Sequence, residues 1–193
     1  YTEEIGEAAF YGPKLDVNVQ PAVGNEITLS TCQLDFCLPA KFNLYYIDKD
    51  GEKKTPVVLH RAILGSLDRF MAYILEETKG NLPTWLAPVQ TRVMPVKTDD
   101  EALNAYAKEV YDTLMENDIR VELDDRAEKL GYRMRDGQIQ KVPYLLVIGM
   151  NEKDNKTVTF RLHGEQETTT LPLDEFVENL KKEINEKART HMN

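Results

Sequence analysis

The stretch Lys141-Val142-Pro143-Tyr144-Leu145-Leu146-Val147-Ile148-Gly149 decides the fold class of the second half of the chain. Residues 143–149 are continuously apolar, which predicts a strand that is covered on both faces, as strands are in the centre of a sheet. Outward from this strand, three more strands are predicted, at residues 89–96, 119–123 and 157–162.

Helical patterns separate these strands. Thr98-Asp99-Asp100-Glu101 offers an N-cap and an acidic first turn, and apolar residues then recur at helical spacing. A second helix is predicted over residues 128–139, and a third near the end of the chain. The apolar faces of the first and last helices consist of Leu103, Tyr106, Val110 and Leu114, and of Leu173, Phe176, Val177, Leu180 and Ile184. The order βαβαββα predicts an α/β domain with a mixed sheet and helices packed on it.

The first half of the chain begins with strand patterns. Apolar and polar residues alternate over residues 14–20 and 27–36, which predicts two half-buried strands. Two shorter strands, 43–46 and 56–60, flank the turn sequence Asp48-Lys49-Asp50-Gly51. We expect these two short strands to pair with each other as an antiparallel hairpin.

A helix then precedes a change in composition. Its apolar residues are Leu67, Phe70, Met71, Ile74 and Leu75, and Gly80 is the expected stop. Residues 81–88 contain two prolines and read as an irregular segment. We therefore expect two domains, residues 1–80 and residues 81–193.

Composition indicates a globular protein of the cytoplasm. Of the 193 residues, 41% are hydrophobic and 30% charged, and no apolar run reaches the roughly 18 residues of a membrane span. Cys32 and Cys37 fit neither a CxxC pair nor a zinc knuckle, so we expect buried, reduced thiols. The chain starts without a Met or a signal sequence, which suggests a segment of a longer protein. Its net charge of −9 leaves RNA binding to a local basic patch.

Five segments carry a resemblance. They are Glu7-Ala8-Ala9-Phe10-Tyr11-Gly12-Pro13-Lys14-Leu15-Asp16, Thr31-Cys32-Gln33-Leu34-Asp35-Phe36, His60-Arg61-Ala62-Ile63-Leu64-Gly65-Ser66-Leu67-Asp68-Arg69-Phe70, Pro83-Thr84-Trp85-Leu86-Ala87-Pro88-Val89-Gln90, and Arg126-Ala127-Glu128-Lys129-Leu130-Gly131-Tyr132 with Lys141-Val142-Pro143-Tyr144. In this order they resemble the substrate loop, the next strand, motif 3, the domain entry and the anticodon-domain signature of threonyl-tRNA synthetases, a class II family. The resemblance spans essentially the whole chain. It implies the antiparallel strands and motif 3 helix of a class II catalytic domain over residues 1–80, and a mixed-sheet α/β anticodon-binding domain over 81–193.

The resemblance implies an enzyme that activates threonine with ATP and Mg²⁺ and transfers it to tRNA(Thr). His60 matches one of three Zn²⁺ ligands, the other two being a Cys and a His that this chain lacks. Zinc with three protein ligands keeps a position open for substrate, and a site that binds the threonine hydroxyl rejects valine. Taken alone, a single His at a strand end is an ordinary surface or core residue.

Further residues match positions around the substrates. Arg69 and Lys14 match catalytic positions, Arg69 being the motif 3 arginine that contacts ATP; otherwise Arg69 is a solvated helix residue. The full set of residues that match threonine- or ATP-binding positions is Tyr11, Lys14, Gln33, Gly65, Ser66 and Arg69. On its own, Gly12-Pro13 reads as a turn, and Gln33 as an inward polar residue that needs a partner.

The predicted RNA contacts lie in the second half. Residues 126–141 contain five basic residues (Arg126, Lys129, Arg133, Arg135 and Lys141) against two acidic ones, a net charge of +3. By resemblance, the tRNA(Thr) anticodon stem-loop is contacted by Arg126, Lys129, Glu152 and Arg161. The family often has Asn where this chain has Ala127, which removes any contact made by that amide. A solvated helix face is the alternative interpretation of the basic residues.

Two other functions stay open at this point. The chain lacks motifs 1 and 2 of the class, so we expect it to be inactive alone, whereas the full-length enzyme is expected to be a homodimer. One alternative is a stand-alone tRNA-binding or regulatory module that uses only the anticodon domain. The other is a different class IIa synthetase, prolyl or histidyl, which shares the anticodon fold but lacks the zinc arrangement at His60.

Overall fold

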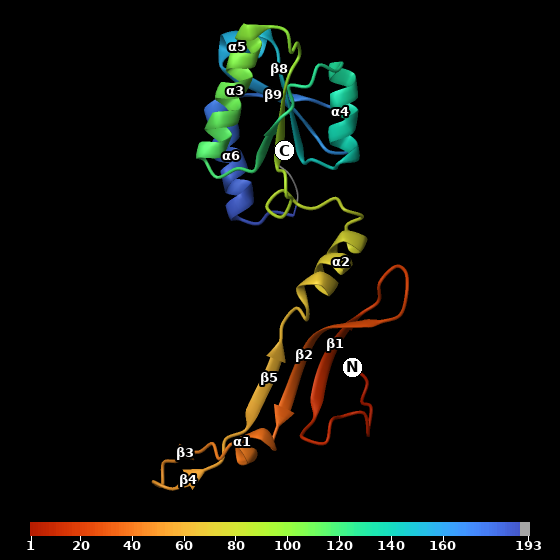
Figure 1. Ribbon diagram of the computed structural model, residues 1–193, viewed down its shortest axis with the longest axis vertical. Helices are drawn as coiled ribbons and strands as arrows, with labels where there is room; N and C mark the ends of the chain where they lie inside the picture. Colours follow the sequence, from red (N-terminus) through yellow and green to blue (C-terminus); the bar gives the residue numbers. More distant parts are fainter. Residues whose placement is uncertain (190–193) are drawn as a thin grey trace. The chain divides into compact units, whose positions relative to one another are not determined.

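The computed structural model describes residues 1–189, and the chain in it divides into two units (Figure 1). Unit 1 comprises Tyr1–Gly80 and unit 2 Asn81–Asn193. The last four residues of the domain predicted over 81–193 lie outside the described residues.

Unit 2 is built around a five-stranded mixed sheet in the order β10-β9-β8-β6-β7. Strand β6 pairs in parallel with β7 and with the central strand β8, whereas β8 with β9 and β9 with β10 pair antiparallel. The strands are β6 (Thr91–Pro95), β7 (Val121–Leu123), β8 (Tyr144–Ile148), β9 (Thr157–Leu162) and β10 (Thr169–Pro172). The fold class predicted from the βαβαββα order is confirmed.

Helices cover both faces of this sheet. They are α3 (Glu101–Glu116), α4 (Leu130–Ile139), α5 (Met150–Asn155) and α6 (Leu173–Asn185). Figure 1 shows α3 and α6 on one side of the sheet and α4 on the other. The side chains of Phe160, Phe176 and Leu180 belong to the larger hydrophobic core, and Met94 and Leu145 to a smaller core that includes residues of α4. Both clusters consist of unit 2 residues, so unit 2 has a core of its own. Each fully buried side chain of this size contributes about 1.5–3 kcal/mol to the stability of the fold.

Local signals predicted most of unit 2 correctly. Tyr144, Leu145, Leu146 and Ile148 are 0% exposed, as expected of a central strand. Asp100 is the N-cap of α3, and its carboxylate accepts hydrogen bonds from the backbone N–H groups of Ala102 and Leu103. The helix α5 and the strand β10 were not predicted, because six and four residues are too few to show a periodic pattern.

Unit 1 contains a three-stranded antiparallel sheet in the order β1-β2-β5, a separate hairpin β3-β4, and two helices. Its elements are β1 (Lys14–Val19), β2 (Ile27–Asp35), α1 (Leu38–Lys41), β3 (Tyr46–Ile47), β4 (Lys53–Lys54), β5 (Val58–Ala62) and α2 (Leu67–Glu77). The backbone N–H of Gly80 donates to the carbonyl of Leu75 at 2.8 Å, which ends α2 where the sequence predicted.

The predicted pairing of residues 43–46 with 56–60 is wrong. The turn forms, but the hairpin around it joins Tyr46–Ile47 to Lys53–Lys54. The strand Val58–Ala62 pairs instead with β2, so that Gln33 lies opposite His60. A turn sequence fixes only its nearest neighbours, whereas the partner of a longer strand is decided by contacts far along the chain.

Unit 1 buries little of its own surface. Its buried residues are Leu29, Ser30, Asp35 and Pro39. Many apolar side chains are exposed, among them Leu15 at 64% and Leu59 at 56%. Cys32 and Cys37 are free thiols, as expected, but partly exposed rather than buried. Strand pairing therefore holds unit 1 together without a hydrophobic core among these residues.

Candidate functional site

Three of the predicted site residues lie in one row across the sheet of unit 1. Lys14 of β1 is the register partner of Gln33 of β2, and Gln33 is the partner of His60 of β5. Register partners point to the same face of a sheet, so the three side chains project from one surface. The structure thus groups residues that lie 46 positions apart in the sequence, from Lys14 to His60.

Tyr11 joins this row through the segment before β1. Its hydroxyl donates a hydrogen bond to Oε1 of Gln33 at 3.3 Å, which supplies the partner that Gln33 needs. The adjacent Gly12 makes this approach possible, since a Cβ there would lie 2.2 Å from the carbonyl oxygen of Leu34. Tyr11, Gln33 and His60 line a cavity of about 460 Å³, whereas Lys14 lines a different pocket.

His60 is held by a buried carboxylate at the floor of that cavity. Its Nε2 lies 2.9 Å from Oδ2 of Asp35, whose side chain is 2% exposed. The backbone N–H groups of Leu38 and Cys37 donate to Oδ1 of Asp35 at 2.9 and 2.8 Å. The hydrogen bond from Leu38 is the largest influence on the pKa of Asp35 and lowers it, so this carboxyl is ionised at neutral pH.

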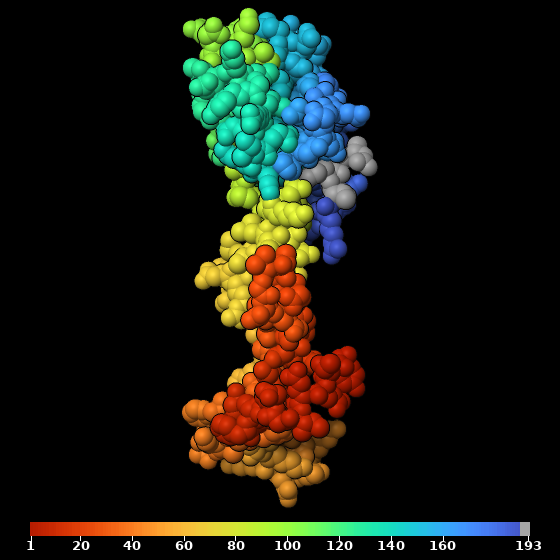
Figure 2. Space-filling model, turned by 90° about the vertical axis from the view of Figure 1, so that its right-hand side faces the viewer, coloured from red at the N-terminus to blue at the C-terminus, as the bar shows by residue number. Residues whose placement is uncertain are grey.

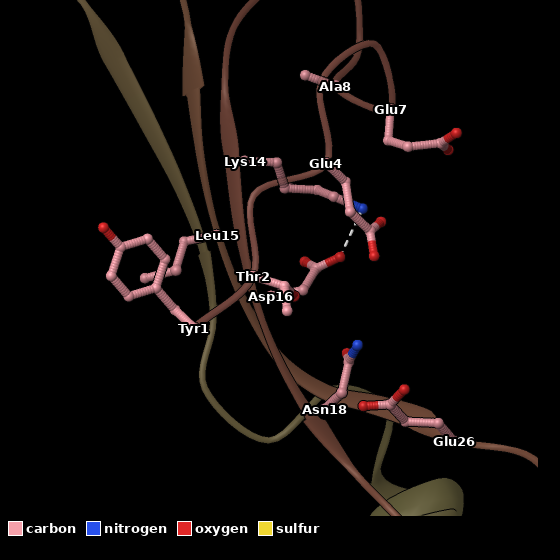
Figure 3. Close-up of a pocket in the computed structure, with 10 residues that line it drawn as sticks. All are labelled: Tyr1, Thr2, Glu4, Glu7, Ala8, Lys14, Leu15, Asp16, Asn18 and Glu26. Carbon is pink, nitrogen blue, oxygen red and sulfur yellow. Dashed lines mark ion pairs between the residues drawn. The ribbon is translucent and has the colours of Figure 1, made fainter.

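Lys14 is also paired. Its ammonium lies 2.6 Å from Oδ2 of Asp16, as Figure 3 shows, and this contact raises the pKa of Lys14 and lowers that of Asp16. The pocket around them has three further carboxylates, those of Glu4, Glu7 and Glu26. Four carboxylates outnumber one lysine, so this pocket does not attract a polyphosphate by its own charge.

The remaining predicted residues of unit 1 lie where β5 leads into α2. Gly65 has φ +64°, and a Cβ there would lie 3.1 Å from the carbonyl oxygen of Leu29, so the fold itself favours glycine at this position. Ser66 is the N-cap of α2, although its side chain makes no capping hydrogen bond. Arg69 lies in the first turn of α2 and is exposed.

The described residues of unit 1 do not form a metal site by themselves. No group of three or more His, Cys, Asp or Glu side chains within residues 1–189 is arranged to hold a metal ion. His60 nevertheless fits a zinc ligand, because a ligating His usually has its other ring nitrogen beside a carboxylate, and Nε2 of His60 lies 2.9 Å from Asp35.

In unit 2, Arg126 precedes α4 and turns toward two carboxylates. Its guanidinium contacts Asp124 and Asp136, each at 2.7 Å. Burial raises the pKa of Asp124, but the hydrogen bonds from Arg126 outweigh this effect and the pKa lies below 3.8. The hydrogen bond from Arg126 is also the main reason why the pKa of Asp136 is lowered. Arg126 is 47% exposed and largely neutralised, whereas Lys129, the N-cap residue of α4, is exposed.

Arg133 is not part of a basic surface, and the predicted +3 patch is wrong in this respect. Its side chain is 0% exposed. It donates hydrogen bonds to the backbone carbonyls of Pro95 and Asp124 at 2.7 Å and of Glu128 at 3.2 Å. Burial lowers the pKa of its guanidinium. Arg133 therefore fastens α4 to the ends of two strands and is out of reach of a phosphate.

Glu152 and Arg161 lie on the same side of the unit 2 sheet. The carboxylate of Glu152 accepts hydrogen bonds from the backbone N–H of Gly149 at 2.8 Å and from the hydroxyl of Thr159 at 2.7 Å. Thr159 and Arg161 alternate with buried residues of β9, and Arg161 is the register partner of Leu145 in the α4-side core. Nε of Arg161 is buried and has no hydrogen-bond partner among the described residues. Figure 2 looks onto this side and shows the teal segment around α4 next to the blue segment of β9 and β10.

The sequence patterns missed Asp35, although a signal was present. It stands two residues after Gln33 in a strand, and residues at that spacing share a face. The sequence gives no comparable signal for the contacts of Arg126 with Asp124 and Asp136, which depend on where α4 packs.

Comparison with known families agrees with this arrangement. Residues 2–78 match the family described as "tRNA synthetase class II core domain (G, H, P, S and T)", and residues 90–183 match the family described as "Anticodon binding domain". These matches place the chain in the class II aminoacyl-tRNA synthetases. Within that class, it belongs to the threonine–tRNA ligases.

Individual relatives give the extent of the similarity. The chain is 54% identical over 184 residues to a threonine–tRNA ligase of Staphylococcus saprophyticus and 50% identical over 187 residues to one of Oceanobacillus iheyensis. These alignments cover 95% and 97% of this chain but only 28% and 29% of the relatives, so the chain spans less than a third of their length.

Solved structures also align with nearly all of this chain but with less than half of their own length. The RNA-binding domain of threonyl-tRNA synthetase from Cryptosporidium parvum aligns with a TM-score of 0.83 at 39% identity, over 92% of this chain and 44% of that chain. A prolyl-tRNA synthetase of the same organism aligns with a TM-score of 0.69 over 97% of this chain and 43% of that chain. At 17% identity, the second match shows the fold alone. Within residues 1–189, no helix is long and apolar enough to cross a membrane.

Proposed function

We propose that this chain is part of a cytoplasmic threonine–tRNA ligase that activates threonine with ATP and Mg²⁺ and transfers it to tRNA(Thr). Unit 1 belongs to the catalytic domain, and its exposed apolar side chains, such as Leu15 and Leu59, fit a sheet that continues into the rest of that domain. Unit 2 is the anticodon-binding domain. The observation that carries the proposal is the cavity that groups Tyr11, Gln33 and His60 in a chain 54% identical to a threonine–tRNA ligase.

In the proposed site, Tyr11 and Gln33 line the threonine pocket, and His60 is one of three Zn²⁺ ligands, with a Cys and a His from outside this chain. Zinc would bind the amino and hydroxyl groups of threonine, which allows the site to reject valine. The Tyr11–Gln33 hydrogen bond fixes the amide of Gln33, so that its NH₂ group is free to donate to the substrate.

For ATP, the proposed contacts come from Lys14, Gly65, Ser66 and Arg69. Arg69 is exposed and has the planar donor fork that suits phosphate and stacking on adenine. Lys14 has three N–H donors, so it can contact the reacting phosphate while one donor stays on Asp16. Both residues act by positioning and charge stabilisation in the in-line attack on the α-phosphate.

For tRNA, Lys129 and Arg126 contact the anticodon stem-loop near α4, and Glu152 and Arg161 read base edges. The half-buried side chain of Arg161 supports this role, since it makes no hydrogen bond to the described residues and its terminal N–H groups can donate to an acceptor. Anticodon bases are splayed out in their loop and present such acceptors.

The test is amino-acid-dependent ATP–pyrophosphate exchange by the full-length protein that contains this segment. We expect threonine to support exchange and valine to fail. Arg69→Ala should reduce the rate by about 10²-fold or more, whereas Lys79→Ala, near the end of α2, should leave it unchanged. Exchange driven by another amino acid, or unaffected by Arg69→Ala, would disprove the assignment.

A further inference from the structure

The contact between Asp35 and His60 assigns the proton on the imidazole ring. Oδ2 of Asp35 lies 2.9 Å from Nε2 of His60. Oδ1 of Asp35 already accepts two backbone N–H groups, and in a contact between a carboxyl group and the more basic imidazole the hydrogen stays on the ring, so we assign it to Nε2. In neutral His60, Nδ1 then carries the lone pair, and the structure records no partner for it among the described residues.

The carboxylate of Asp35 is itself fixed. Oδ1 accepts the backbone N–H groups of Cys37 and Leu38 at 2.8 and 2.9 Å, and the side chain is 2% exposed. The pairing of β2 with β5 places Asp35 opposite Val58, two residues from His60 on the same face. Sheet register and turn therefore hold Oδ2 beside the ring independently of any bound group.

We propose that Asp35 is a positioning residue that keeps the proton of His60 on Nε2 and so leaves Nδ1 as the nitrogen that binds the metal. The inference rests on the zinc-ligand role proposed above for His60. A carboxylate in this position orients the ring and makes the ligating nitrogen more basic, and losing such a partner costs about 10–100-fold in metal affinity.

Asp35→Asn separates this role from a structural one. The amide oxygen can keep the hydrogen bonds from Cys37 and Leu38, which preserves the turn. Its NH₂ group then faces Nε2 as a donor and drives the ring proton to Nδ1. We expect the full-length protein to stay folded and its Kd for Zn²⁺, measured by competition with a chelator, to rise about 10–100-fold.

Two controls accompany this variant. Asp48→Asn removes the same charge from unit 1 but alters only the β3–β4 turn and the ion pair with Lys54, so its Kd should equal that of the wild type. His60→Ala should abolish tight binding. If zinc binding is absent or insensitive to His60→Ala, the proposed ligand role fails and this inference fails with it. If His60→Ala abolishes binding while Asp35→Asn binds as tightly as the wild type, the inference alone is overturned.

A second measurement uses the wild-type protein and so does not depend on whether a variant folds. In wild-type, zinc-depleted protein labelled with ¹⁵N-histidine, the ring signals of His60 should show the Nε2–H tautomer. An Nδ1–H tautomer would overturn the inference even if Asp35→Asn were unstable.

Discussion

Replacing Arg133 by Met tests whether this buried cation is structural. The guanidinium is 0% exposed and satisfies three backbone carbonyls, those of Pro95, Asp124 and Glu128. Met occupies a similar volume but donates no hydrogen bond, so the three oxygens lose their partner. A buried acceptor without a partner costs about 1–3 kcal/mol. We therefore expect unit 2 to lose about 3 kcal/mol of stability.

Urea unfolding followed by tryptophan fluorescence is the assay. The chain has one Trp, Trp85, which lies in unit 2, so the signal reports this unit even in the presence of unit 1. With a slope of about 1–3 kcal/mol per molar urea, a loss of 3 kcal/mol lowers the midpoint by about 1–3 M.

The matched control is Arg135→Met, because Arg135 is exposed on the same helix. Its effect should stay within about 0.5 kcal/mol. A midpoint for Arg133→Met that equals that of Arg135→Met would refute the reasoning. It would return Arg133 to the set of residues available for RNA.

Three further predictions concern unit 2. Gly137→Ala places a Cβ 2.5 Å from Cδ2 of the buried Leu145 and should lower the stability of unit 2 by about 1–3 kcal/mol. Gly131→Ala on the same helix meets open space and should be neutral or stabilising. Thermal unfolding of both variants measures the difference. Residues 82–193 should fold alone, since the core is contained in them, and a disordered NMR spectrum would disprove this. The two carboxyl groups that contact Arg126 have lowered pKa values, so they stabilise the folded state fully above their unfolded pKa of 3.8, and this stabilisation is lost as the pH falls through their folded pKa values. Arg126→Met should therefore flatten the decline of Tm between about pH 5 and 2. An unchanged decline would contradict the pairing.

The sequence predicted the elements whose pattern is local. Residues 143–149 were recognised as a central strand because a strand covered on both faces is apolar throughout. The N-cap at Asp100 was recognised because its carboxylate serves backbone groups two and three residues away. The pairing of Val58–Ala62 with β2 was missed because it depends on long-range contacts.

For the candidate sites, the family resemblance predicted which residues are involved, and the structure shows the hydrogen bonds, ion pairs and burial of those residues. The grouping of Tyr11, Gln33 and His60 was expected from family motifs, and the structure places them around one cavity. Arg133 was misread because a charge count treats every cation as a surface residue, whereas burial is decided by packing. The roles assigned to Glu152 and Arg161 stay predictions.

Anticodon recognition by unit 2 is tested most directly by titrating the chain with stem-loops at two salt concentrations. One stem-loop carries the threonine anticodon and the others carry substituted anticodons. We expect the cognate stem-loop to bind more tightly at both concentrations. Arg161→Ala should cost about 1–3 kcal/mol and remove most of the discrimination. Lys181→Ala changes an exposed residue of α6, whose buried residues belong to the core on the opposite face of the sheet, and should leave both unchanged. Equal affinity for every anticodon, unaltered by Arg161→Ala, would contradict the account.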